Sequence, residues 1–139
     1  MRLNLPSEVT ATLPLMTAQT LVLRPASDAL EAVELSSDAG GDGTHLQALY
    51  AALDVRLVDV IRLSDDIDAW LDDEGRVNGS EPNSLATAVF RAFGWHLNHG
   101  DDTRGAVLFA GHDGEGGMCS LSARQDAILR DAFAQALRM

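Results

Sequence analysis

The stretch Leu63–Asn83, LSDDIDAWLDDEGRVNGSEPN, combines a strand pattern, turn residues and a helix start. If residues 66–72 are extended, alternation places Ile67, Ala69 and Leu71 on one face, which we expect to be buried. The opposite face then carries acidic residues and a tryptophan, namely Asp66, Asp68, Trp70 and Asp72. The stretch therefore predicts a strand with one apolar face and one acidic face.

Turn and cap residues follow this strand. Asp73, Glu74 and Gly75 are expected to reverse the chain, because Asp tolerates turn positions and Gly adopts positive φ without strain. Pro82 and Asn83 indicate a helix start, at which the Asn side chain can accept a free backbone N–H. We therefore predict a hairpin after residue 72, followed by a helix.

The composition is that of one globular domain with a strong acidic excess. The chain has 139 residues, of which 46% are hydrophobic and 22% charged, enough for a single core. Twenty-one acidic residues against ten basic ones give a net charge of −11, which disfavours direct contact with nucleic acid or an anionic membrane. A single cysteine, Cys119, and the absence of a long apolar run predict a cytoplasmic protein without an intrachain disulfide.

The remaining patterns predict an α+β fold. Strands are expected at 19–24, 30–35, 55–63 and 106–110. Helices are expected at 44–53, 84–93 and 122–138, the last because Ser122 and Gln125 have capping-box spacing. Apolar residues on both faces of 55–63 favour a central strand. We therefore expect a single domain over 19–139, with a short mixed or antiparallel sheet of about five strands and three helices, after an N-terminal extension at 1–18.

Several turn, cap and strand residues also carry a family resemblance. They are Trp70, Asp72, Glu74 and Gly75, then Asn78, Gly79, Pro82, Asn83, Ala86 and Thr87, then Gly105–Gly111. In these residues and in the order of its elements, the chain resembles the family known as domain of unknown function 3846, found in bacteria and their viruses. The resemblance covers about residues 19–112, with the helix at 122–138 as an addition. It implies a small α+β domain, often of mobile-element or viral origin, with no assigned substrate.

Metal and cofactor sites are not expected. An EF-hand template with Gly75 at position 6 leaves Trp70 at position 1, where a carboxylate is required. His96 and His99 have helical metal-ligand spacing, but Gly94 and Gly100 indicate a loop. The glycine-rich segment 111–117 lacks the cation of a phosphate loop, and Cys119 has no activating neighbour except His112. We therefore predict no metal, no cofactor and no catalytic residue.

Three hypotheses about function remain. The leading one is a small binding or accessory protein that acts on a protein partner of unknown identity through its surface rather than by catalysis. Its predicted binding surface is formed by Asp66, Asp68, Trp70, Asp72, Asp73 and Glu74. The alternatives are an acidic nucleic-acid mimic that inhibits a DNA-handling protein, and a metal-assisted hydrolase. A mimic requires a ridge of carboxylates, and an enzyme requires a concave pocket. Whether the protein forms a homo-oligomer is left open.

Trp70 has two interpretations. On an exposed acidic face, it would be a recognition residue whose loss weakens partner binding. Covered by a helix or by the N-terminal extension, it would be a core residue whose loss lowers stability. The choice depends on what packs over that face of the strand.

Overall fold

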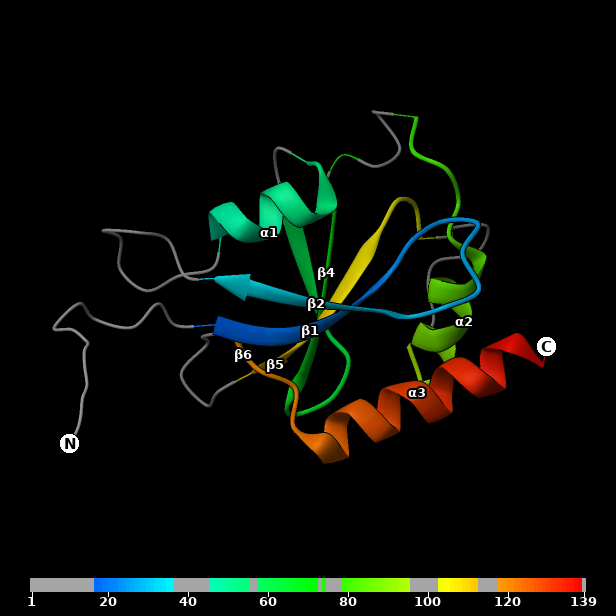
Figure 1. The fold of residues 1–139 in the computed structure, drawn as a ribbon. Helices are drawn as coiled ribbons and strands as arrows, with labels where there is room; N and C mark the ends of the chain where they lie inside the picture. Colours follow the sequence, from blue (N-terminus) through cyan, green and yellow to red (C-terminus); the bar gives the residue numbers. More distant parts are fainter. Residues whose placement is uncertain are drawn as a thin grey trace, which may run out of the picture.

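The computed structural model describes residues 17–36, 46–55, 58–72, 74, 79–95, 103–112 and 118–138. It contains one open antiparallel sheet with helices on both faces, so the predicted α+β class is confirmed (Figure 1). In chain order the elements are β1 Thr17–Leu23, β2 Glu31–Ser36, α1 Leu46–Leu53, β3 Val58–Arg62, β4 Ile67–Asp72, α2 Ser84–Ala92, β5 Val107–His112, β6 Met118–Cys119 and α3 Ala123–Leu137.

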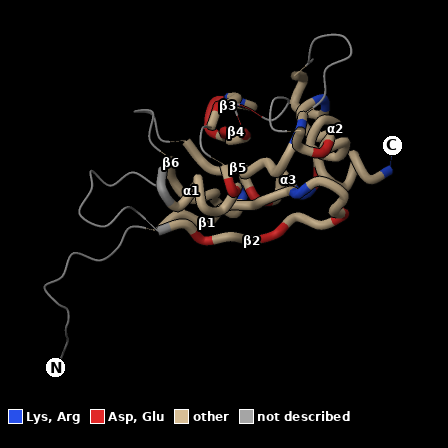
Figure 2. Tube along the Cα trace, turned by 90° about the horizontal axis from the view of Figure 1, so that it is seen from above, with Lys and Arg blue, Asp and Glu red and all other residues tan. Residues whose placement is uncertain are grey.

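β5 is the central strand of the sheet. The order is β2-β1-β5-β4-β3, and β6 pairs with the end of β5. Figure 2 shows β3 and β4 on one side of β5 and β1 and β2 on the other. The four residues from Val107 to Ala110 are fully buried, because side chains on both faces of this strand meet a helical layer. The continuous apolar run at 106–110 is typical of such a position.

The helices divide the core into two clusters, one on each face. On one face, Leu49 and Leu53 of α1 pack with buried residues of the sheet, including Leu108. On the other face, α2 and α3 pack against the sheet, and Phe90 of α2 meets Phe109 of β5 edge to face, with ring centroids 6.3 Å apart. The sheet is therefore the middle of three layers.

The prediction that 55–63 forms a central strand is wrong, because β3 lies at the edge of the sheet. Its apolar residues alternate between the two clusters: Val58 packs toward the α1 side and Ile61 toward the α2 and α3 side. Helical layers on both faces therefore produce the same two-sided apolar pattern as a central position.

The predicted hairpin after residue 72 is also wrong. β4 pairs with β3 on one side and β5 on the other, so neither side can accept a strand that follows it. The hairpin precedes β4 instead: β3 and β4 are joined by a tight turn at which the N–H of Leu63 donates to the carbonyl of Ile67 at 3.0 Å. Of the predicted turn residues, Asp73 and Gly75 lie outside the described part of the chain.

The helix starts are the most accurate local predictions. The side chain of Asn83 accepts the N–H of Ala86 at the start of α2, and Ser122 and Gln125 form a complete capping box at the start of α3. The start of the first predicted helix, at residues 44 and 45, lies outside the described residues. Within α3, Ile128 is 37% exposed, whereas Leu129 beside it is buried.

Asn83 is a buried polar residue with every side-chain group paired. Its residue exposure is 1%, and its Nδ2 donates to the carbonyls of Leu23 at 3.0 Å and Gly105 at 2.9 Å. Its Oδ1 accepts the N–H of Ala86 at 3.1 Å, and its backbone N–H donates to Thr103 at 2.7 Å. One amide therefore joins the end of β1, the segment before β5 and the start of α2.

β6 is a two-residue strand that the sequence patterns did not predict, and it lies very close to β5. A Cβ on Gly111 would lie 2.6 Å from the carbonyl oxygen of Ser120 and 3.0 Å from Sγ of Cys119. Because the first of these atoms belongs to the backbone, it cannot move aside as a flexible side chain would. Glycine at position 111 is therefore required for β6 to pair with β5.

We expect Asn83→Ala to lower the free energy of unfolding by about 2–4 kcal/mol, because it removes a helix cap and the amide partner of one buried and one partly buried carbonyl. Urea denaturation followed by circular dichroism measures the change. Ser84→Ala is the matched control, since Ser84 is adjacent but exposed. A loss for Asn83→Ala no larger than that of the control would contradict the central role of the amide.

We expect Gly111→Ala to lower the free energy of unfolding by about 1–3 kcal/mol through overpacking against β6. Gly79→Ala is a useful comparison, because Gly79 has a φ of +73° but nothing within 4 Å of an added Cβ. That variant meets only backbone strain, about 1 kcal/mol. Amide exchange should locate the effect of Gly111→Ala at residues 118–120, and unchanged exchange there would refute it.

Candidate functional site

The two faces of β4 match the predicted alternation. Ile67, Ala69 and Leu71 lie on the side of α2 and α3, where they belong to the larger apolar cluster or pack against it. Trp70 packs on the opposite side, against the α1 cluster. Asp68 and Asp72 share the parity of Trp70 and therefore point toward the α1 side.

The predicted acidic surface is not uniformly exposed. Asp68 and Asp72 are only 4% and 9% exposed, whereas Asp66 and Glu74 are half-buried. Asp73 lies outside the described residues. The expectation of one exposed acidic face is therefore wrong for Asp68 and Asp72, which are buried on the side of β4 that also carries Trp70. A binding role for the set remains a prediction.

Asp68 belongs to a polar cluster at the end of the sheet where β3 and β5 finish and β4 begins. Its Oδ2 lies 3.3 Å from Nδ1 of His112, and its Oδ1 lies 3.4 Å from Nε of Arg62. Nη2 of Arg62 is 3.2 Å from the same Nδ1 of His112. The side chains of Asp68 and His112 are buried and that of Arg62 is largely exposed, so a surface guanidinium closes over a buried Asp–His pair.

The tautomer of His112 decides how this cluster is bonded. Nδ1 can donate a hydrogen bond to Asp68 if it carries a proton, or accept a hydrogen bond from Arg62 if it does not, but it cannot do both at once. With Nδ1 protonated, Asp68 orients the ring as the carboxylate of a catalytic triad orients its histidine. Cys119 is not the missing nucleophile, because it pairs with Gly111 while His112 pairs with Met118, so the two side chains lie on opposite faces. Cys119 therefore supplies no nucleophile to this pair.

Trp70 is covered on the α1 side. It is partly buried and packs against the apolar cluster around α1. Its Nε1 is buried and has no hydrogen-bond partner among the described residues. These observations support its interpretation as a packing residue.

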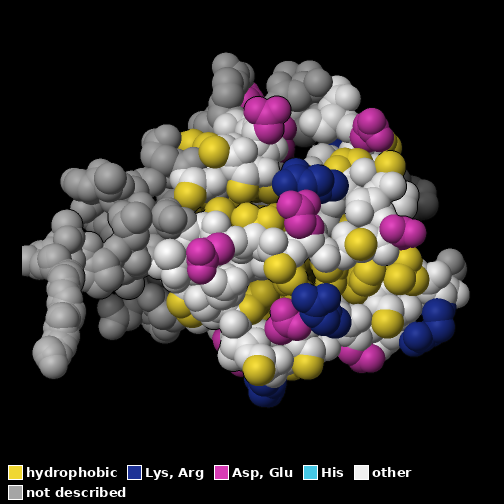
Figure 3. Space-filling model, in the orientation of Figure 1, with side chains coloured by type: hydrophobic (Ala, Val, Ile, Leu, Met, Phe, Trp, Pro, Cys, Tyr) yellow, Lys and Arg dark blue, Asp and Glu magenta, His cyan; other side chains and the backbone are white. Residues whose placement is uncertain are grey.

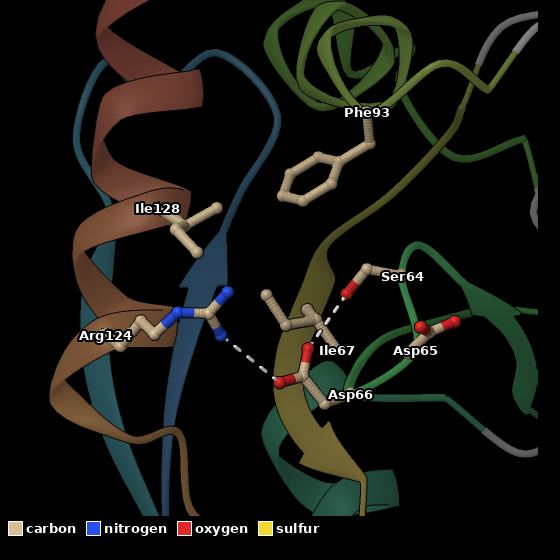
Figure 4. A pocket seen from close by; sticks show the side chains of 7 residues that line it. All are labelled: Ser64, Asp65, Asp66, Ile67, Phe93, Arg124 and Ile128. Carbon is tan, nitrogen blue, oxygen red and sulfur yellow. Dashed lines mark hydrogen bonds and ion pairs between the residues drawn. The ribbon is translucent and has the colours of Figure 1, made fainter.

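A hollow of about 280 Å³ opens on the other side of the sheet. It lies where the β3–β4 turn, the end of α2 and the first turns of α3 meet, and its lining residues are Ser64, Asp65, Asp66, Ile67, Phe93, Arg124 and Ile128. Figure 4 shows the apolar side chains of Phe93 and Ile128 above Ile67, with Arg124 directed at Asp66. Of these residues, only Asp66 belongs to the set predicted to bind a partner.

Charges at the rim of the hollow are incompletely balanced. Asp66 accepts a hydrogen bond from the Ser64 hydroxyl at 3.1 Å and lies 3.6 Å from Nη1 of Arg124. Asp65 is exposed and has no ion-pair partner among the described residues. Asp66 therefore faces the guanidinium of Arg124, and Asp65 adds a second carboxylate to the same turn, which leaves the rim with an excess of negative charge.

The start of α3 is joined to the same turn. Gln125 completes the capping box by accepting the N–H of Ser122 at 2.8 Å, and its Nε2 donates to the carbonyl of Asp66 at 2.8 Å. The spacing of Arg124 and Ile128, one helical turn apart, is the sequence signal that could have placed both on this rim. Nothing local indicates that the turn at 64–66 lies opposite them.

The other predicted ligand residues give no metal site within the described structure. His96, His99 and residues 113–117 lie outside the described part of the chain. Within that part, no three His, Cys, Asp or Glu side chains are grouped so as to hold a metal ion. No helix in the same part is long and apolar enough to cross a membrane.

The fold described above defines a small single-domain α+β protein with an open antiparallel sheet. The chain belongs to the family described as a domain of unknown function (DUF3846), whose model matches residues 16–134. The matched range continues past residue 112 and includes most of α3. Neither the curated proteins nor the solved structures compared with this chain gave a match.

Two substitutions at Trp70 test its packing role. We expect Trp70→Ala to lower the free energy of unfolding by about 3 kcal/mol, because a large side chain leaves the α1 cluster. Trp70→Phe keeps most of the packing and removes the unpaired Nε1–H, so we expect a loss of about 1 kcal/mol. Thermal melts compare the two variants. A wild-type melting temperature for Trp70→Ala would show that Trp70 is not a packing residue and would favour its role as an exposed recognition residue.

Proposed function

We propose that this protein is a non-catalytic binding module that holds a basic side chain of a partner protein in the hollow between the β3–β4 turn, α2 and α3. The observation that carries the proposal is the pairing of apolar walls with an acidic rim. Phe93 and Ile128 can receive the aliphatic stem of a partner's Lys or Arg, and Asp65 can receive its charged end. Asp66, which belongs to the binding surface predicted from the sequence, also lines this hollow.

The size of the hollow supports a side chain as its occupant. Small-molecule sites are clefts of roughly 300–1,000 Å³ that enclose most of the ligand. This hollow, of about 280 Å³, lies below that range and is open to solvent. A protruding side chain needs less room, and the rest of its chain can remain on the surface.

Long-range charge favours the same partner. The net charge of −11 attracts basic surfaces and repels acidic ones, which raises the association rate with a basic partner. The acidic residues visible in Figure 3 are dispersed among apolar and neutral side chains. Because Asp68 and Asp72 are buried, β4 supplies no carboxylate ridge for the nucleic-acid mimic. The hydrolase alternative likewise gains no supporting observation.

Selection from a displayed library of random short peptides tests this function. We expect enriched peptides to combine Lys or Arg with apolar neighbours, and their binding to weaken as salt is added. We expect Ile128→Asp or Asp65→Arg to reduce binding at least about tenfold, since each change makes the hollow unsuitable for a basic side chain.

Leu137→Asp is the matched control for Ile128→Asp. Leu137 is an exposed apolar residue at the far end of the same helix and does not line the hollow, so we expect normal peptide binding. Thermal melts establish that each variant is folded. Enrichment of acidic peptides, or equal effects of the Ile128 and Leu137 substitutions, would refute the proposal.

A further inference from the structure

β3 is an edge strand whose outward backbone groups can be identified from the register. It pairs with β4 and with no other strand among the described residues. The N–H of Leu63 donates to Ile67, and opposed residues in an antiparallel ladder alternate between bonded and non-bonded pairs. The opposed pairs Val60–Trp70 and Arg62–Asp68 are therefore non-bonded. It follows that the backbone N–H and C=O of Val60 and Arg62 point away from β4.

Two of these outward groups are already occupied by side chains. Oδ1 of Asp59 accepts the N–H of Val60 at 2.9 Å. Nε1 of Trp95, from the segment after α2, donates to the carbonyl of Arg62 at 2.9 Å. We call Asp59 and Trp95 the edge caps. Without the edge caps, the N–H of Val60 and the carbonyl of Arg62 could form hydrogen bonds with the backbone of another strand.

The edge caps come from different parts of the chain and act on an exposed apolar edge. Asp59 lies within β3, whereas Trp95 reaches Arg62 across 33 positions in sequence. Val60 and Trp95 are 43% and 38% exposed, two of the few large apolar side chains left on the surface of the described residues. An uncapped edge with exposed apolar side chains is a template for strand pairing.

We propose that Asp59 and Trp95 prevent β3 from pairing with the β3 of a second copy of this chain. The strand is self-complementary, because antiparallel pairing about a two-fold axis at Val60 sets Val58 opposite Arg62 of the other copy. In that register, each outward N–H faces an outward C=O. Two such sheets would join into one continuous sheet through the uncapped edges.

Net charge sets the sign of the salt dependence. Each copy carries −11, so repulsion opposes the dimer at low ionic strength. Added salt screens this repulsion and should strengthen edge pairing. Binding of a basic peptide in the hollow has the opposite salt dependence, so failure of one proposal is distinguishable from failure of the other.

Sedimentation equilibrium of the double variant Asp59→Ala/Trp95→Phe tests the proposal. Phe keeps most of the aromatic ring and removes the Nε1–H, and Ala removes the carboxylate. We expect the variant to self-associate at least about tenfold more tightly than the wild type, more so at high salt. Backbone amide exchange should slow at Val60 and Arg62 as the protein concentration rises, and remain unchanged in β2, the other edge.

Two further variants serve as controls. Asp28→Ala removes the same charge as Asp59→Ala from an exposed residue outside the sheet, and we expect it to stay monomeric. Val60→Lys, added to the double variant, places two cations opposite each other at the two-fold axis and should restore the monomer. If the double variant does not fold, the single variants Asp59→Ala and Trp95→Phe take its place, each with one edge group uncapped.

Three results would overturn the proposal. The first is a folded uncapped variant that keeps the wild-type mass at every concentration and salt level. The second is self-association with slowed amide exchange in β2 and not in β3. The third is a wild-type protein that already pairs through β3 with both caps in place.

Discussion

A single buried amide, that of Asn83, connects the sheet to the helical layer that forms the hollow. It satisfies the carbonyl of Leu23 at the end of β1, the carbonyl of Gly105 before β5 and one N–H at the start of α2. The Leu23 carbonyl and the Ala86 N–H make their bonds to Asn83 in buried positions, so each would carry a desolvation cost if left unpaired. The same cap sets where α2 begins, and the helix ends at Ala92, just before Phe93 and Trp95. Both the hollow and the cap on Arg62 depend on that end point.

The parts of the fold that the sequence predicted are those determined by near neighbours in the chain. Alternation assigned the faces of β4, and cap residues located the starts of α2 and α3. The position of β3 at the edge depends on which strands pair across the sheet, a non-local choice that a two-sided apolar pattern does not report. β6 is too short for any periodicity to reveal. The errors therefore concern pairing, and the correct predictions concern local geometry.

The candidate site follows the same division. Sequence identified Asp66 but not Phe93, Arg124 or Ile128, which come from other elements and meet it only in the folded chain. The other carboxylates of the predicted surface were judged by their charge, yet burial of Asp68 depends on the layer that covers β4 and on His112 and Arg62 beside it. Two carboxylates of this stretch, those of Asp68 and Asp72, are thus buried within the fold. An acidic composition does not by itself locate an acidic surface.

Gln125 gives the hollow a thermodynamic link to the stability of α3. Its carboxamide closes the capping box with one atom and holds the Asp66 carbonyl with another, so the first turn of the helix and the β3–β4 turn share one side chain. Fraying of that turn would release Asp66 and open the floor of the hollow. A ligand that requires the closed hollow would therefore suppress fraying by mass action, in proportion to its free concentration. Opening of the first turn of α3 and binding of a ligand in the hollow therefore report on the same equilibrium.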